Sequence, residues 1–211
     1  MSEIIPAMLV DSEQEFRDKV AKMGAIVKSI QVDVMDGTLV KNTSWADAAT
    51  VKAMSLPYRI EAHLMVENPA KAAADWIAAG AETIIPHAEA EGWRDAARLA
   101  REAGRKAGVA INPDTSIAVL ADDMALIDMV LVMGVTPGWS GQSFQPVALE
   151  KIGELRRSYP ELKIEVDGGV GFMNAHELAA AGADSLVAAS ALWKADDFET
   201  TFRELNEAAT V

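Results

Sequence analysis

Residues 30–37 read IQVDVMDG, and this stretch decides how we expect the chain to fold. Up to Met35 the run is β-branched or apolar except at Gln31 and Asp33, which are two apart and therefore share one face of a strand. A strand of a parallel barrel is buried on both faces and reads as an apolar run. Polar residues at its C-terminal end therefore indicate a site rather than packing.

The same pattern occurs at 60–65 (IEAHLM) and at 164–169 (IEVDGG). Burying a carboxylate costs several kcal/mol unless it is paired or coordinated. We therefore expect Asp33, His63 and Asp167 to converge in a functional site, with a polar network that only fills the interior as the alternative. For Glu61 and Glu165, one layer deeper, packing and support of the site are equally consistent.

Short β-branched runs alternate with Ala/Leu-rich helical runs along the chain, and no linker divides it. Eight such units predict one α/β domain, a (β/α)8 (TIM) barrel over residues 1–211. An open doubly wound sheet would normally show a Gly-rich turn after the first strand, where this chain reads LVDSE (9–13). The predicted strands are Ile4–Val10, Val27–Val34, Arg59–Leu64, Thr83–Pro86, Val109–Ile111, Met129–Val132, Lys163–Val166 and Ser185–Ala188.

Turn and cap residues mark where the predicted helices begin and end. Asp11-Ser12 and Asn68-Pro69 predict helix starts, and further helices are expected over 174–181, with His176 on the surface, and over 196–208. Left-handed glycines are expected to end helices before the next strand at Gly24, Gly80, Gly108 and Gly182.

The composition restricts the partners. The chain has 32 acidic and 19 basic residues, a net charge of −13, and no cysteine. Such acidity argues against nucleic acid and anionic membranes as partners, although backbone N–H groups can still hold phosphate. Disulfides and thiolate metal sites are excluded. The start MSEIIPAMLVDSEQ has no signal-peptide pattern and no window is apolar enough to span a membrane, so we expect a cytoplasmic protein.

Two glycine-rich segments follow the last strands: TPGWSGQSF (136–144) and DGG (167–169), with Ala189-Ser190 after the eighth. Barrels often bind phosphate with these loops, because glycine lets the backbone approach an anion. His87, after the fourth strand, could also face the barrel mouth. For Asp36, beside Gly37, a turn role and a chemical role are equally consistent.

Taken together, seven segments resemble the ribulose-phosphate 3-epimerase family in the family's order: IQVDVMDG (30–37), HLMVENP (63–69), PHAEAEG (86–92), GVAINPDTSIAVL (108–120), VLVMGVTPGWSGQSF (130–144), EVDGGV (165–170) and AAAGADSLVAASALW (179–193). The resemblance implies sugar-phosphate interconversion of the pentose phosphate kind. One base removes the C3 proton of a ketose phosphate, an enediolate forms, and an acid reprotonates the opposite face. Asp33 and Asp167 match the acid/base pair.

The resemblance also implies the binding residues. The matched substrate contacts are His63, Met35, Met65, Gly138, Trp139, Ser140, Gly141, Gly168, Gly169, Ala189 and Ser190. Family members hold a divalent metal ion, such as Zn, Mn, Fe or Co, on two aspartates and two histidines. Asp33, His63 and Asp167 match three of these ligands. Gln31 stands where the family has the other histidine, and a neutral amide oxygen suits zinc poorly, so we expect metal binding to be weakened or absent.

Other departures cluster around the same site: Ala7 replaces a serine, Lys41 a proline, Trp139 a phenylalanine, and Ala189 a glycine. They leave two alternatives to ribulose-phosphate epimerisation: an epimerase for another ketose phosphate, such as allulose 6-phosphate, and a phosphosugar-binding barrel with impaired catalysis. A related barrel decarboxylase would need Asp-x-Lys where this chain has Asp33-Val34-Met35, which disfavours that activity. The family also suggests a homo-oligomer.

Overall fold

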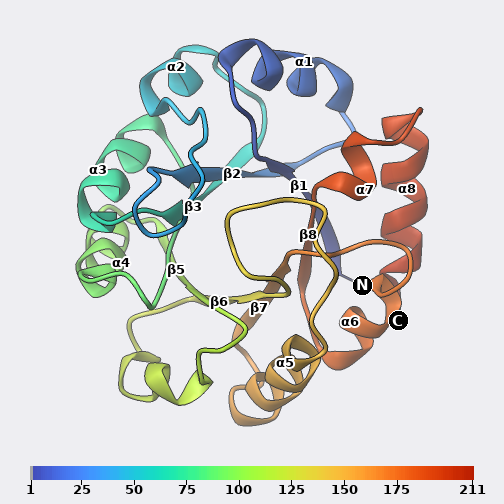
Figure 1. Ribbon diagram of the computed structural model, residues 1–211. Helices are drawn as coiled ribbons and strands as arrows, with labels where there is room; N and C mark the ends of the chain where they lie inside the picture. The colour runs from blue at the N-terminus through green and yellow to red at the C-terminus, as the bar shows by residue number, and fades with distance from the viewer. Residues whose placement is uncertain (1) are drawn as a thin grey trace.

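A computed structural model describes residues 2–211, which form a closed barrel of eight parallel strands surrounded by helices (Figure 1). Each strand pairs with the next in the sequence, and β1 closes the barrel against β8 with Ile4 opposite Leu186. The predicted (β/α)8 barrel is confirmed.

The predicted strands are confirmed with shifts of a few residues at their ends. The strands are β1 Glu3–Met8, β2 Ser29–Met35, β3 Arg59–Met65, β4 Thr83–Pro86, β5 Lys106–Ile111, β6 Met129–Met133, β7 Lys163–Asp167 and β8 Ser185–Ala188. The helices are α1 Glu13–Met23, α2 Ala48–Ala53, α3 Pro69–Ala79, α4 Trp93–Glu102, the 3-10 helix η1 Ile117–Asp123, α5 Val147–Ser158, α6 Ala175–Ala181, α7 Ser190–Trp193 and α8 Phe198–Ala208. Among residues 2–211, no helix has the length and apolar character needed to cross a bilayer.

The helix starts follow the predicted caps. The Ser12 hydroxyl accepts a hydrogen bond from the Glu15 N–H (3.2 Å), and the Asn68 side chain accepts one from the Lys71 N–H (3.1 Å). Pro69 occupies the first turn of α3, where its missing N–H costs nothing. The last helix begins two residues later than predicted, because Asp197 caps α8.

Two glycine predictions need correction. Gly108 does not end a helix but lies inside β5, where an added Cβ would come within 2.9 Å of Ile85. The chain leaves α4 at Gly104 instead, with φ 69°. Gly80 and Gly182 are left-handed as predicted, whereas Gly24 combines a φ of 56° with a ψ of −151°, outside that region.

The barrel interior is divided between apolar and polar side chains, because alternate residues of every strand point inward. Strands β4–β6 contribute an apolar cluster (Ile85, Ala110, Met129, Leu131, Met133), and β1 and β8 contribute another (Ile5, Ala7, Val187). Strands β2, β3 and β7 contribute inward polar residues instead: Gln31 and Asp33, Glu61 and His63, and Glu165 and Asp167. Register sets Gln31 opposite Glu61 and Asp33 opposite His63, so polar side chains start from two layers, and the Gln31 amide extends into the Asp33–His63 layer.

Candidate active site

A hollow opens at the C-terminal ends of the strands. Of the predicted site residues only the buried Gln31 does not line it. The lining includes Asp33, Met35, His63, Met65, Gly138, Trp139, Ser140, Gly141, Asp167, Gly168, Gly169, Ala189 and Ser190. Sequence reasoning missed Met133 and Val135, which also line the hollow; Met133 is an inward residue of β6 in the alternation that places Leu131 inside the barrel.

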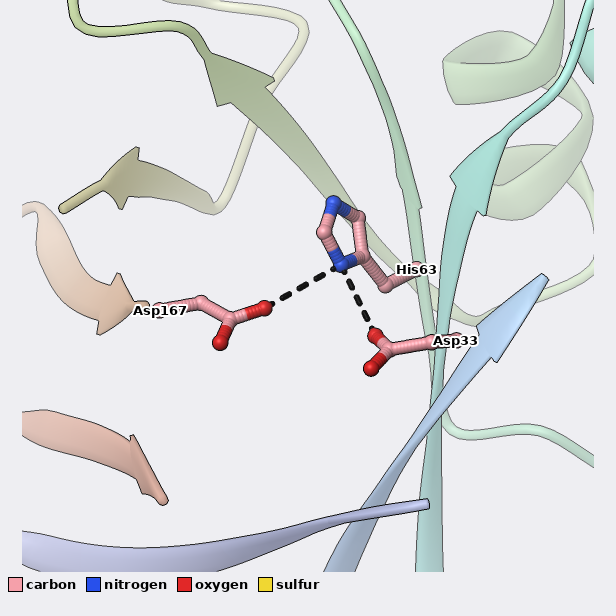
Figure 2. A group of neighbouring side chains, drawn as sticks. All are labelled: Asp33, His63 and Asp167. Atoms are coloured by element: carbon pink, nitrogen blue, oxygen red, sulfur yellow. Dashed lines mark hydrogen bonds and ion pairs between the residues drawn. The ribbon is translucent and has the colours of Figure 1, made fainter. Parts of the chain in front are cut away.

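Asp33, His63 and Asp167 meet at the floor of this hollow (Figure 2). The Nδ1 atom of His63 lies 3.0 Å from Asp33 Oδ1 and 3.3 Å from Asp167 Oδ2. One ligand atom from each residue lies within 4.8 Å of the others. The two carboxylates approach the ring from strands on opposite sides, and their side chains are 7% and 13% exposed. A small molecule in the hollow can therefore reach both.

Gln31 lies between the two carboxylates. Its Nε2 donates to Asp33 Oδ1 (2.9 Å) and to Asp167 Oδ2 (2.8 Å), and lies 3.4 Å from His63 Nδ1. The Oε1 atom of the same amide is buried without a hydrogen-bond partner. The carboxamide thus supplies hydrogen bonds to both acids but no charge.

The contacts at the floor of the hollow shift the pKa values of His63 and Asp167. Burial alone would lower the pKa of His63, but its hydrogen bonds with Asp167 and Asp33 and their charges raise that pKa to about 9. Burial raises the pKa of Asp167, and the charge of Asp33 raises it further. A carboxyl group with a raised pKa accepts a proton more readily near neutral pH.

His87 lies next to His63, away from the hollow. Both rings are fully buried and stacked, with centroids 5.0 Å apart and Nε2 atoms 2.8 Å apart. Burial lowers the pKa of His87, and the charge of His63 acts in the same direction. The structure therefore places His87 behind the floor rather than at the mouth.

Glu61 and Glu165 form a separate layer nearer the N-terminal ends of the strands. The Lys163 ammonium donates to Glu61 Oε1 (3.4 Å) and Glu165 Oε2 (3.2 Å), and the Ser185 hydroxyl donates to Glu165 Oε2. Burial raises the pKa of Glu61 to about 8, and the charge of Glu165 contributes. Neither glutamate lines the hollow.

The loops around the hollow depend on glycines in the left-handed region. Gly138, Gly141, Gly168 and Gly169 have φ values of 119°, 79°, 105° and 70°. A Cβ on Gly169 would lie 2.8 Å from the Phe144 backbone, so the two loops pack together only with glycine there. Asp36 serves its turn role, since its carboxylate accepts from the N–H groups of Thr38 and Glu67, each at 2.9 Å.

The floor residues fit a divalent metal ion in part. Two carboxylates and one imidazole, from Asp33, Asp167 and His63, are a donor set that such ions accept. Gln31 turns its N–H group toward the same point. To become a fourth ligand it would have to rotate its amide so that Oε1, now without a partner, takes the place of Nε2.

Comparison with known proteins gives a consistent result. A family model described as the ribulose-phosphate 3 epimerase family matches residues 3–193. The ribulose-phosphate 3-epimerase of Escherichia coli K12 is 36% identical over 210 residues, covering 96% of this chain and 93% of that protein. The protein of the same name from Aquifex aeolicus is 39% identical over 184 residues, covering 83% and 82%.

Solved structures show the same barrel at low identity. The 3-hexulose-6-phosphate synthase of Salmonella typhimurium gives a TM-score of 0.76 at 16% identity, covering 98% of both chains. KGPDC from Streptococcus mutans gives 0.77 at 10% identity, covering 99% of this chain and 97% of that one. These likenesses support the fold.

Proposed function

The chain belongs to the ribulose-phosphate 3-epimerase family, and on that premise we propose that it interconverts D-ribulose 5-phosphate and D-xylulose 5-phosphate. One observation carries the proposal: Asp33 and Asp167 reach the same atom, His63 Nδ1, from different sides of the floor of a single hollow. Epimerisation needs two groups that exchange protons with opposite faces of one carbon, and two carboxylates on opposed strands meet that need.

In the proposed reaction, one aspartate removes the proton from C3, beside the C2 carbonyl. The electrons pass into an enediolate, and the other aspartate returns a proton to the opposite face. The raised pKa of Asp167 suits a group that must take a proton. Gln31 holds both carboxylates in place through its Nε2 donors, so neither acid has to reorganise before it reacts.

A divalent metal ion at Asp33, His63 and Asp167 would supply positive charge near the enediolate oxygens. We propose that this chain binds such an ion more weakly than a site with a second histidine would. The amide of Gln31 must rotate before its oxygen can coordinate, and it then gives up two hydrogen bonds to the carboxylates. A neutral oxygen is also a poorer zinc ligand than imidazole.

We propose that the substrate phosphate lies against Ser190 and the left-handed glycines of the 136–144 and 167–169 segments, whose backbone N–H groups the missing side chains leave accessible. Met35, Met65 and Met133 would cover the sugar carbons from the apolar side. A phosphorylated ketose as ligand, a homo-oligomer as assembly and the cytoplasm as location belong to the same proposal.

The test is conversion of D-ribulose 5-phosphate to D-xylulose 5-phosphate, followed by NMR with purified protein and added Co²⁺. Allulose 6-phosphate is measured in parallel. Faster turnover of ribulose 5-phosphate supports the proposal. Faster turnover of allulose 6-phosphate would assign the other ketose, and binding of both without turnover would mean that catalysis has been lost.

A further inference from the structure

A line of hydrogen bonds leads from His63 away from the hollow. His63 Nε2 lies 2.8 Å from His87 Nε2, and His87 Nδ1 lies 3.1 Å from Glu89 Oε2. Both rings are fully buried, and the Glu89 side chain is 23% exposed. The proposed reaction uses neither His87 nor Glu89.

The other oxygen of Glu89 is held just as firmly. Oε1 accepts from the Asn112 backbone N–H (3.0 Å) and from the Thr115 hydroxyl. The loop that carries these donors is fixed in turn by the buried Lys151 ammonium. It donates to three carbonyl oxygens of that loop, those of Asn112, Pro113 and Thr115, at 2.6, 2.7 and 2.6 Å. Glu89 therefore has one orientation, with Oε2 toward His87.

These contacts fix where the ring protons lie. The ionised Glu89 carboxylate only accepts, so His87 must carry its proton on Nδ1. His87 faces an acidic group only through Nδ1, so burial keeps its ring neutral and leaves a lone pair on Nε2. The 2.8 Å contact between the rings needs one proton, and it must therefore come from His63 Nε2.

We propose that Glu89, through His87, is a positioning residue that keeps one proton on His63 Nε2, so that Nδ1, which faces Asp33 and Asp167, is the nitrogen that loses its proton when a metal ion binds. The value of this arrangement for metal binding and catalysis rests on the proposed function, whereas the ring protons themselves do not depend on it. In the opposite arrangement His87 would donate from Nε2, His63 would accept there, and the proton on His63 Nδ1 would be the last on that ring and would block a metal ligand. Outer hydrogen bonds to a ligating histidine commonly change metal affinity by about 10- to 100-fold.

Glu89→Gln provides an isosteric test. Glutamine has one accepting oxygen, and the Asn112 N–H is backbone and cannot turn away. The oxygen must therefore face Asn112, and the amide N–H group must face His87 Nδ1. His87 is then expected to carry its proton on Nε2 and to donate it to His63.

The decisive measurement is the ¹⁵N–¹H NMR spectrum of the histidine rings in the full-length, metal-free protein. The chain has three histidines, so His176→Gln removes the exposed one and leaves two rings to assign. We expect Nδ1–H on His87 and Nε2–H on His63 in the wild type, and Nε2–H on His87 in Glu89→Gln. A wild-type His87 with its proton on Nε2 would overturn the proposal without any variant, as would identical tautomers in the two proteins.

Two control variants separate the tautomer from general damage. Thr115→Val removes one donor to the same Glu89 oxygen but leaves the Asn112 N–H, so the wild-type tautomers should remain. Glu91→Gln alters an exposed acid nearby and should change neither ring. Co²⁺ titration then measures the effect on metal binding. We expect the Co²⁺ affinity to be about 10- to 100-fold weaker in Glu89→Gln and unchanged in the two control variants. Equal Co²⁺ binding by wild type and Glu89→Gln, including none by either, would overturn the claim that the tautomer matters for the metal.

Discussion

The two polar layers inside the barrel are built alike and differ in what lies between their carboxylates. In the deeper layer, the Lys163 ammonium bridges Glu61 and Glu165 at 3.4 and 3.2 Å. In the layer nearer the C-terminal ends of the strands, which forms the floor of the hollow and is called the mouth below, the Gln31 amide bridges two aspartates at 2.9 and 2.8 Å. Both pairs face inward from their strands, but the cation between the deeper acids is a lysine, whereas the cation at the mouth is the His63 imidazole, which can release its proton.

This difference distinguishes an acid pair that stabilises the fold from an acid pair that can react with a ligand. A buried carboxylate paired with an ammonium is largely neutralised and has little free energy to gain from a ligand. The carboxylates at the mouth are held by a neutral amide and by an imidazole that can release its proton, so they remain available to a proton or a cation. The mouth is therefore less favourable for stability than the deeper layer, as is common for sites that act on a ligand.

The largest effect is expected when one acid at the mouth is neutralised. Asp33→Asn and Asp167→Asn should each abolish C3 proton exchange, because a general base contributes about 10²- to 10⁴-fold. The urea midpoint should change little, since asparagine keeps the shape of the side chain. Exchange at the wild-type rate in either variant would remove that aspartate from the acid/base pair.

The deeper layer should respond in stability instead. Lys163→Met leaves two buried acids without their cation and should cost about 3 kcal/mol in urea unfolding, at the low end for a buried pair because Lys163 is 31% exposed. Adding Glu61→Gln should recover part of that loss. Per folded molecule, turnover should be unchanged.

The control for this variant is Lys71→Met, which removes an exposed lysine paired with Asp75 at 3.6 Å. It should cost less than about 0.5 kcal/mol. An equal cost for the two lysine variants would mean that the deeper layer is not held together by Lys163.

A third change makes the mouth a better metal site. Gln31→His should raise Co²⁺ or Zn²⁺ affinity by at least about tenfold, because imidazole replaces an amide that now presents its N–H group to the site. Calorimetric titration of the metal-free protein measures this. Unchanged affinity would show that the remaining ligands do not hold an ion in this geometry.

The smallest effect concerns the support behind the mouth. Burial alone would raise the pKa of Glu89, but hydrogen bonds from His87, Thr115 and Asn112 lower it to about 2. The lowered pKa contributes stability that is present above pH 4.5 and lost as the pH falls through about 2. The free energy of unfolding of the wild type should therefore exceed that of Glu89→Gln by about 1 kcal/mol at pH 6, after allowance for solvent screening. Near pH 2 the two free energies should be almost equal. A difference that stays constant with pH in urea unfolding would contradict this assignment.

Much of this arrangement could be predicted from the sequence, because period-two polar residues at strand ends specify which side chains face the mouth. The prediction for Gly108 is wrong because a glycine before a β-branched run reads as a helix end, whereas here β5 needs the missing side chain to pack against Ile85. The 3-10 helix η1 between β5 and β6 follows no local signal that we identified.

The finer chemistry depends on contacts between strands. His87 lies behind the floor of the hollow because of the register between β3 and β4, in which Leu64 is opposite Pro86. Lys163 begins a strand, where a lysine is usually solvated, yet its long stem carries the ammonium into the barrel. The amide orientation of Gln31 follows from two carboxylates that are distant in sequence.

The most direct test of the central claim is solvent deuterium exchange at C3 of ribulose 5-phosphate, followed by NMR with added Co²⁺ and again with chelator. We predict incorporation at C3 in the presence of Co²⁺ and slower incorporation in chelator, where Asp33 and Asp167 act without the added charge. An absence of deuterium at C3 under both conditions would contradict the claim that this mouth moves a proton on ribulose 5-phosphate.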